Sequence, residues 1–301
     1  MVPVRLSCIA LDAKCGRAAL FTLRCRVVRI LGSVPLAPDD PALLHQLFAH
    51  LMHAFPDCAA VSMQAFPRER QACLGRDPRH RCAIVHGWRA CHAIALPATL
   101  PVYLAGLSAK KRYNLARQYR LLEQAAGTLE LKRIERGADV GELVDGIAAI
   151  VRGGGAPGSG RAADYPVLAA HRLLLSYVLK SGDDVVAVIA GSSYGDTWHV
   201  HQIHYAPRLR QFSAGAVALQ CALQDVIAHF AFTSADFGFG EPRHRFASTH
   251  VLEERAHVLV TRRGSAARWL LAAFVRYDDA HAACVRLVRS LRSLLQRLLP
   301  G

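Results

Sequence analysis

The sequence predicts an α/β fold with mixed sheets, arranged as two fused units. Two observations lead to this prediction. Segments with apolar residues at helical spacing alternate along the chain with short runs rich in valine, isoleucine and aromatic residues, which are typical of strands. The 301 residues suit two domains better than one, and an apolar fraction of 52% is enough for two hydrophobic cores. This composition excludes a disordered chain.

Residues 1–104 are expected to form the first unit. Its clearest helical signal is an apolar stripe from Pro41 to Phe55, and its clearest strand signal is the partial alternation over residues 18–30. Further strands are expected at 59–66, 82–86 and 91–96. Pro97 and Pro101 mark the joint to the second unit.

Residues 105–262 are expected to form the second unit, which opens with a basic helix. Ser108 is placed to cap the start of this helix, and Gly127 is placed to end it. The elements expected after it are a strand at 128–135, helices at 140–151 and 166–180, a hairpin over 185–204, a helix at 213–230, and strands at 234–237 and 257–261. Strands interleaved with helices in this way are typical of an α/β or α+β domain.

The last part of the chain, residues 263–301, is predicted to be an amphipathic helical tail. From Ser265 onward apolar residues recur at helical spacing, with arginines between them. Such a helix can make peripheral contact with an anionic membrane, or it can pack its apolar stripe against its own protein. No window of 18 apolar residues occurs, so we expect no membrane-spanning helix.

The formal net charge of +14 points to an anionic partner, such as a nucleic acid, an anionic lipid or a phosphorylated substrate. A second explanation competes with it. Arginine supplies most of the 37 basic residues in a chain that is also rich in alanine, which suggests GC-rich coding and a charge excess spread over the surface. One compact basic cluster occurs, at residues 110–112 with Arg117 and Arg120.

The nine cysteines predict reduced thiols in a cytoplasmic protein. Their number is odd and no CxxC pair occurs, so neither a disulfide framework nor a zinc site is indicated. Residues 1–10 lack the apolar stretch of a signal peptide. His199 and His201 share one face of a strand, but they have no acidic neighbour in the sequence. We therefore expect no metal.

The most informative segment is the strand, loop and helix over residues 197–231. Four small residues, 213–216, open the helix, and Arg210 precedes them. The first turn of a helix presents unpaired N–H groups and the positive end of the helix dipole, and small residues let a phosphate approach the backbone. An arginine just ahead adds charge-assisted hydrogen bonds. Because small residues begin many helices, the pattern also fits an ordinary helix start.

This segment resembles the donor loop of GNAT acyltransferases, which holds the pyrophosphate of acyl-coenzyme A with the pattern Q/R-x-x-G-x-G/A between a strand and a helix. The resemblance implies that acyl-CoA, such as acetyl-CoA, is the co-substrate. Ser213 stands where the pattern has its first glycine, and it adds a Cβ atom at a crowded position. The residues implied to bind the donor are Arg210, Gln211, Phe212, Ser213, Ala214, Gly215 and Ala216.

Two further segments, 107–134 and 236–246, resemble blocks of the cellulose-biosynthesis-associated GNAT family, in family order and with family-like spacing. That family is similar to the Fem-type aminoacyltransferases, which contain two GNAT-like units. The resemblance covers a little over half of the chain. It implies a double-GNAT protein, in which residues 1–104 are a degenerate first unit and residues 105–262 carry the acyltransferase site.

Acyl transfer needs one group that takes the proton of the acceptor and another that stabilises the leaving thiolate. The candidates are Glu241, Asp236, His204 and Tyr205. Glu241 lies in the loop after the strand that contains Asp236, while His204 and Tyr205 end the strand before the donor loop. Structural roles compete for three of them: an ion pair with a nearby arginine for Glu241, and packing or substrate contact for Asp236 and His204.

Arg112, Asn114 and Arg117 lie at the start of the basic helix, where the resemblance implies that they line the acceptor side or bind donor phosphates. A solvated basic face is the alternative. The function implied is transfer of an acyl group, in the simplest case acetyl, to an amine or hydroxyl of a small molecule or polysaccharide precursor. Two alternatives are a Fem-like transferase with aminoacyl-tRNA or an acyl carrier protein as donor, and an inactive GNAT-derived binding protein.

Overall fold

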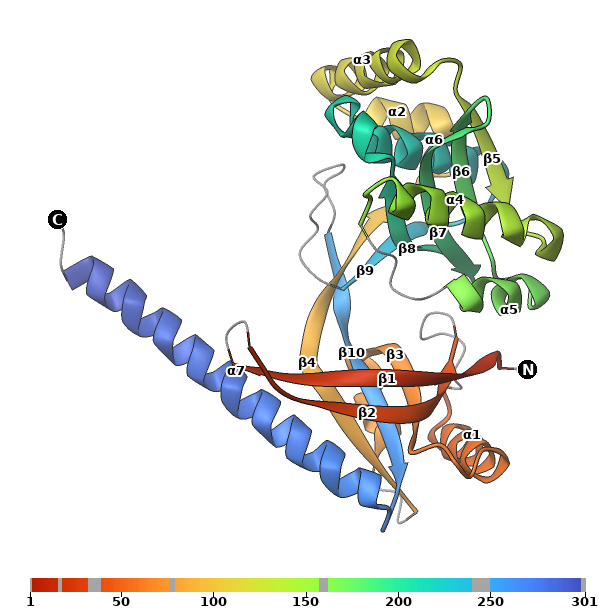
Figure 1. Ribbon diagram of the computed structural model, residues 1–301. Helices are drawn as coiled ribbons and strands as arrows, with labels where there is room; N and C mark the ends of the chain where they lie inside the picture. Colours follow the sequence, from red (N-terminus) through yellow and green to blue (C-terminus); the bar gives the residue numbers. More distant parts are fainter. Residues whose placement is uncertain are drawn as a thin grey trace. The chain divides into compact units, whose positions relative to one another are not determined.

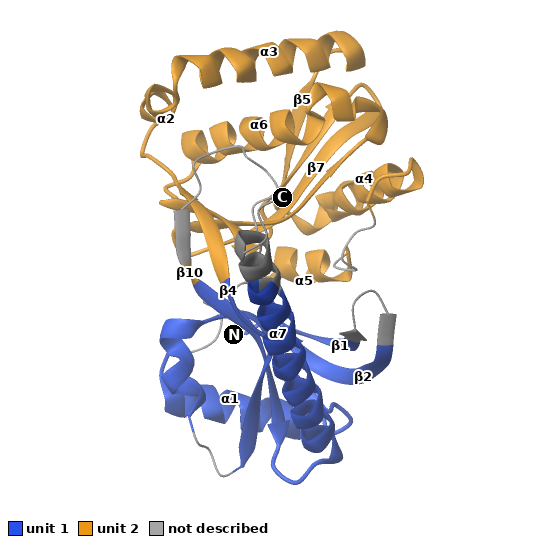
Figure 2. Ribbon diagram, turned by 90° about the vertical axis from the view of Figure 1, so that its left-hand side faces the viewer, with its two compact units in different colours: residues 1–89, 254–301 blue, residues 90–253 orange. Residues whose placement is uncertain are grey.

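The computed structural model (Figure 1) describes residues 2–15, 18–31, 39–75, 79–156, 162–239 and 250–298. The chain divides into two compact units, coloured separately in Figure 2. Unit 1 consists of residues 1–89 and 254–301, and unit 2 consists of residues 90–253. These boundaries differ from the expected divisions after residues 104 and 262.

Unit 1 is built on a mixed sheet. Strand β1 pairs antiparallel with β2, β2 pairs parallel with β3, and β3 pairs antiparallel with β10, which lies beside the first part of β4. The elements of this unit are β1 (Val4–Cys15), β2 (Ala18–Ile30), α1 (Pro41–Ala54), β3 (Ala60–Pro67), the 3-10 segment η2 (Arg68–Leu74), the start of β4 (His80–Ala95), β10 (His250–Arg262) and α7 (Ala266–Leu298). The helix expected at 41–55 and the strands expected at 18–30 and 59–66 are confirmed.

Residues 254–301 belong to unit 1 because they complete its sheet and its core. Val258 and Val260 of β10 are fully buried beside Phe48 of α1. Leu271 and Phe274 of α7 are buried in a second cluster with residues of β1 and β2. The start of the C-terminal helix therefore packs its apolar stripe on its own protein, whereas Leu287, Val288 and Leu291 further along are exposed.

In unit 2 the strands of the sheet follow the order β4-β9-β8-β7-β6-β5, to which β4 contributes its last part. Strands β8 and β9 are parallel, and the other neighbouring pairs are antiparallel. The elements are α2 (Leu100–Gly106), α3 (Ala109–Ala126), β5 (Glu130–Ile134), α4 (Val140–Arg152), α5 (Tyr165–Ala170), β6 (Ser176–Ser181), β7 (Asp184–Tyr194), β8 (Thr197–Tyr205), α6 (Ala214–His229) and β9 (Ser234–Phe239). The α/β fold with a mixed sheet, expected from the sequence, is confirmed.

Helices cover both faces of the unit 2 sheet. Ile189 of β7 packs in the cluster formed with α6, whereas the neighbouring Val188 lies under Gly146 of α4. Because successive side chains of a strand point to opposite faces, α6 and α4 lie on opposite sides of the sheet. Helices α2 and α3 contact α6 and form an outer layer on its side.

The basic helix α3 begins and ends where the sequence indicates. The Oγ of Ser108 accepts a hydrogen bond from the backbone N–H of Lys111 at 3.2 Å. Gly127 has a positive φ of 100°, and its N–H donates to the carbonyl of Glu123 at 2.8 Å, which ends the helix.

The helix expected over residues 166–180 is wrong. Helix α5 ends at Ala170, Arg172 adopts a left-handed φ of 57°, and residues 176–181 form strand β6. Val178 and Leu179 of this strand are both buried, because β6 lies inside the sheet and is covered on both faces. A strand buried on both faces loses the alternation of apolar and polar residues that distinguishes it from a helix in sequence.

Among the described helices, none combines the length and apolar composition that crossing a bilayer requires.

Candidate functional site

The loop before α6 has the backbone of an anion-binding turn. Segment η5 (Pro207–Phe212) leads into Ser213, which adopts the left-handed conformation with φ 60° and ψ 37°. The carbonyl of Ser213 accepts from the N–H groups of Ala216 and Val217 at 2.8 and 3.0 Å. The N–H groups of Ala214 and Gly215 thus precede the first hydrogen bond within the helix, where orphan donors and the positive dipole end favour an anion.

Gly215 lets this helix end approach strand β8 closely. A Cβ atom at this position would lie 3.0 Å from Cδ1 of Tyr205 and 3.2 Å from Cγ2 of Ile203. Both distances are tighter than ordinary van der Waals contact. The space that a side chain would need is therefore taken up by the strand, so only glycine lets the first turn of α6 pack this closely on β8.

A cavity of about 160 Å³ lies at this turn. Its lining residues are Ile203, Tyr205, Arg210, Ser213, Ala214, Gly215 and Ala216. Two of the predicted donor-binding residues do not line it: Gln211 is exposed, and Phe212 packs against the core cluster under α6. Arg210 is the one charged residue of this lining, so the cavity combines a cation with free backbone donors and holds no carboxylate.

The second arginine of the loop has a different role. The guanidinium of Arg208 donates to Oδ2 of Asp184 at 2.7 Å, and both side chains are more than half exposed. Arg208 is therefore occupied outside the cavity that Arg210 lines.

His199 and Asp236 form a buried pair where strands β8 and β9 part. Their parallel pairing covers three rungs and ends at His199 and Asp236. Nδ1 of His199 lies 3.1 Å from Oδ2 of Asp236, and the side chains are only 5% and 2% exposed. Oδ1 of Asp236 accepts from the N–H of Gly238 at 2.7 Å. A neutral histidine that donates from Nδ1 to this carboxylate keeps Nε2 as an acceptor.

Nε2 of His199 is shielded from solvent and has no hydrogen-bond partner within the described part of the chain. In the sequence this histidine stands out only because it shares a strand face with His201, as metal ligands can. His201 instead pairs with Ser192, whose Oγ lies 2.8 Å from its Nε2. The signal that points to His199 is the strand-helix-strand order over residues 197–239, since a parallel β8–β9 pair can bring Asp236 beside it.

The remaining predicted catalytic residues have separate environments. His204 lies next to Tyr205 in β8, so the two side chains point to opposite faces of the sheet. Nε2 of His204 is 3.0 Å from Oε1 of Gln202. Burial lowers the pKa of His204, and a hydrogen bond with the backbone of Ala156 opposes that effect. Tyr205 lines the loop cavity. Glu241 lies outside the described residues.

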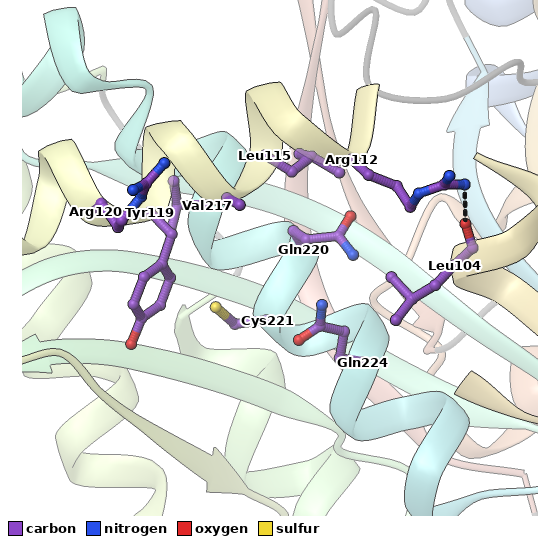
Figure 3. Close-up of a pocket in the computed structure, with 10 residues that line it drawn as sticks. Leu104, Arg112, Leu115, Tyr119, Arg120, Val217, Gln220, Cys221 and Gln224 are labelled. Carbon is purple, nitrogen blue, oxygen red and sulfur yellow. Dashed lines mark hydrogen bonds between the residues drawn. The ribbon is translucent and has the colours of Figure 1, made fainter. Parts of the chain in front are cut away.

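The predicted substrate-binding residues of α3 separate into two groups. The Nη1 of Arg112 donates to the carbonyls of Leu104 and Leu107 at 3.1 and 2.5 Å, which closes the end of α2. Arg112 also lines a second cavity, of about 480 Å³, between α2, α3 and α6 (Figure 3). Asn114 and Arg117 are exposed and line neither cavity. Arg120, one turn further along, lines the second cavity instead.

No group of three or more His, Cys, Asp or Glu side chains in the described ranges is arranged to hold a metal ion.

Comparison with known families concerns unit 2, which contains the loop before α6 and the His199–Asp236 pair. Residues 109–246 match the family model of the acetyltransferase (GNAT) domain. The match covers a little under half of the chain and includes the loop before α6 and the His199–Asp236 pair. The fold of unit 2 is therefore that of a GNAT domain. The finer resemblance to the cellulose-biosynthesis-associated GNAT family stays a prediction.

Solved structures of low sequence identity are also similar to the chain. FemX is 8% identical, with a TM-score of 0.48, over 84% of this chain and 88% of that one. A tandem GNAT protein from the clavulanic acid biosynthesis pathway is 11% identical, with a TM-score of 0.44, over 88% and 85%. L-PGS from Bacillus licheniformis is 15% identical, with a TM-score of 0.44, over 84% and 85%. No curated protein matches the chain.

Proposed function

We propose that unit 2 transfers an acyl group, in the simplest case acetyl, from acyl-CoA to an amine or hydroxyl of a small-molecule or glycan-precursor acceptor. The observation that carries this proposal is the cavity at the start of α6. There a left-handed Ser213, a closely packed Gly215 and the cationic Arg210 surround free backbone donors. A pyrophosphate needs such a combination of N–H groups, a helix dipole and an arginine.

The lining of this cavity is chemically compatible with the pyrophosphate of coenzyme A. Gly215 allows the first turn to pack against the cavity wall, and no acidic side chain of the lining would repel a phosphate. Tyr205 contacts this turn, so we assign it to the wall of the phosphate cavity and no longer to proton transfer. Arg210 is the residue that would neutralise the pyrophosphate.

We assign the proton transfer to His199, with Asp236 as the residue that orients it. His199 lies six positions before Tyr205 in β8, about 20 Å along the strand at ~3.3 Å per residue, and an irregularity in the β7–β8 pairing between them places its side chain on the opposite face of the sheet. The pantetheine arm of coenzyme A can bridge a separation of this order, which would bring the thioester toward the point where β8 and β9 part. The acceptor reaches the enclosed Nε2 only if neighbouring side chains move.

Acyl transfer at this site then needs only one proton-carrying group, His199. The acceptor nitrogen or oxygen forms a bond to the thioester carbonyl carbon while its proton passes to Nε2 of His199. The carbon–sulfur bond breaks, and the same proton is available to the leaving thiolate of coenzyme A. Asp236 stabilises the imidazolium between the two transfers, as a carboxylate that receives an Nδ1–H does in other acyl-transfer sites.

The proposal is tested by isothermal titration calorimetry with acetyl-CoA. We expect saturable binding that weakens about tenfold or more in Arg210→Gln, because hydrogen bonds to charged groups contribute ~1.5–3 kcal/mol. Arg208→Gln is the matched control, since it removes the same charge from the same loop but breaks only an exposed ion pair with Asp184. Equal loss in both variants, or no binding by the parent protein, would contradict the proposal.

A second donor class is favoured by the net charge of +14. Aminoacyl-tRNA and acyl carrier protein are both strongly anionic, and their binding would be sensitive to salt. If either one binds at low salt while acetyl-CoA does not bind at all, the donor is a macromolecule and the alternative holds.

A further inference from the structure

The cavity between α2, α3 and α6 has the size and walls of a small-molecule site. Its volume of about 480 Å³ lies within the range of known ligand pockets, roughly 300–1,000 Å³. Leu104, Leu115, Ala116 and Val217 give it an apolar body. Cys221 adds to this body because burial raises the pKa of its thiol to about 11, so the sulfur stays neutral at physiological pH.

One polar group in the wall lacks a partner. The Oε1 of Gln220 accepts a hydrogen bond from the hydroxyl of Tyr103 at 3.1 Å. The Nε2 of the same amide is buried and has no hydrogen-bond partner among residues 79–156 and 162–239 or the other described ranges. Figure 3 shows this amide between Arg112 of α3 and Gln224 of α6. A buried donor without an acceptor is destabilising, and a ligand oxygen would relieve that cost after a small rotation of the amide.

The charged groups of this cavity are both cationic. Arg112 and Arg120 line it, and none of its lining residues is acidic. The hydrogen bonds of Arg112 to the carbonyls of Leu104 and Leu107 fix its guanidinium at the edge of the cavity, with its other N–H groups available. An anion placed between the two guanidinium groups would gain charge-assisted hydrogen bonds.

We propose that this cavity binds a small amphipathic anion, namely an apolar chain that ends in one carboxylate or phosphate. The apolar chain lies against Leu115, Val217 and the neutral Cys221, and the head group meets Arg112, Arg120 and the amide of Gln220. This site is distinct from the loop cavity, whose lining residues it does not share. The proposal does not depend on acyl transfer.

Calorimetry with three probes of one chain length tests the ligand class. Decanoate, decyl phosphate and decanol are titrated into the full chain at concentrations below micelle formation. We expect at least one anion to bind about tenfold or more tightly than the neutral alcohol, because hydrogen bonds to a charged head group are stronger than those to a hydroxyl. The stronger of the two anions identifies a carboxylate or a phosphate head group. Equal binding of the alcohol and both anions, or no saturable binding, would overturn the proposal.

Variants locate the binding in this cavity. Ala116→Trp fills the space from the exposed side of α3, and Arg120→Gln removes one cation; each should weaken anion binding about tenfold. Lys110→Gln is the matched control, since it removes one charge from the exposed surface of the same helix without touching the cavity. Thermal melts confirm that each variant is folded. If Ala116→Trp and Arg120→Gln bind as the parent does, the site lies elsewhere.

Thiol alkylation provides an independent readout. The bound anion should slow the alkylation of Cys221 at high pH, as measured by mass spectrometry, and should leave the exposed Cys8 unchanged. Slowing at both cysteines or at neither would contradict binding at this cavity.

Discussion

A Cβ atom on Gly215 would lie 3.0 Å from Cδ1 of Tyr205, so helix α6 begins in direct contact with strand β8. This contact places the aromatic ring of Tyr205 in the wall of the cavity at the first turn of α6. A glycine is needed here because of the distance to Tyr205, and its helical backbone has no positive φ.

The variant Gly215→Ala should weaken acetyl-CoA binding about tenfold. The new methyl group displaces Tyr205 and Ile203 by a few tenths of an ångström and narrows the cavity. Calorimetry measures the affinity. The control is Gly141→Ala in α4, where a Cβ atom would meet no atom within 4 Å. That control should keep the parent affinity and gain up to ~1 kcal/mol of stability from helix propensity. Unchanged affinity in Gly215→Ala would contradict the account of the cavity.

The variant Ser213→Gly should make the protein more stable. Ser213 adopts a left-handed φ of 60° and its side chain makes no capping hydrogen bond, so the serine carries backbone strain without compensation. A non-glycine residue in this region costs on the order of 1 kcal/mol, of which the larger chain entropy of glycine offsets a part. Chemical denaturation measures the gain, and Ser213→Ala, which keeps the Cβ atom, should show none. A loss of stability in Ser213→Gly would show that the hydroxyl has a role.

The variant His199→Gln should reduce kcat about 100-fold or more and leave the KM for acetyl-CoA unchanged, because proton transfer contributes roughly 10²–10⁴-fold in rate. Asp236→Asn should also reduce kcat, since the amide no longer fixes the tautomer of His199. Steady-state kinetics with an identified acceptor checks both. His201→Gln loses a contact with Ser192 on the same strand and serves as the control. If His199→Gln keeps a kcat near that of the parent, another residue is the general base.

The stability of unit 1 should fall as the pH falls from about 6.5 to about 4. His257 of β10 lies 2.8 Å from Oγ of Ser62, and burial, with the nearby charges of His86 and Arg29, lowers its pKa from 6.5 to about 4. Between pH 6.5 and about 4, His257 is therefore mostly protonated in the unfolded chain and mostly neutral in the folded chain. The loss by pH 4 is on the order of 3 kcal/mol from this group.

Denaturant titrations at several pH values test this dependence. His257→Gln keeps a side chain that can hydrogen-bond to Ser62 but cannot titrate, so its stability should depend less steeply on pH in that window. The same slope in the parent and in His257→Gln would assign the pH dependence to other groups.

The turn before α6 and the start of this helix could be predicted from the sequence because their parts are contiguous. Residues 210–216 form the turn and the start of α6 with few contributions from distant residues, so the small residues and the arginine identify it locally. The His199–Asp236 pair could not be found in this way. Its members are 37 positions apart and meet only through the parallel pairing of β8 and β9.

The division into units differs from the expected one for a related physical reason. Strand β10 pairs with β3, nearly 200 positions earlier in the chain, and no local pattern encodes that pairing. The prediction of a helix over residues 166–180 is wrong for a different reason. The apolar run of β6 fits a buried helix and a buried strand equally well until its neighbours in the sheet are known.

The central claim is that the start of α6 binds the pyrophosphate of the acyl donor. The most direct test compares the dissociation constants of coenzyme A and pantetheine, which lacks the pyrophosphate and the nucleotide. We predict that coenzyme A binds about 100-fold more tightly than pantetheine, equivalent to ~2.7 kcal/mol, and that Arg210→Gln removes most of this difference. Equal affinity for the two compounds would contradict the claim.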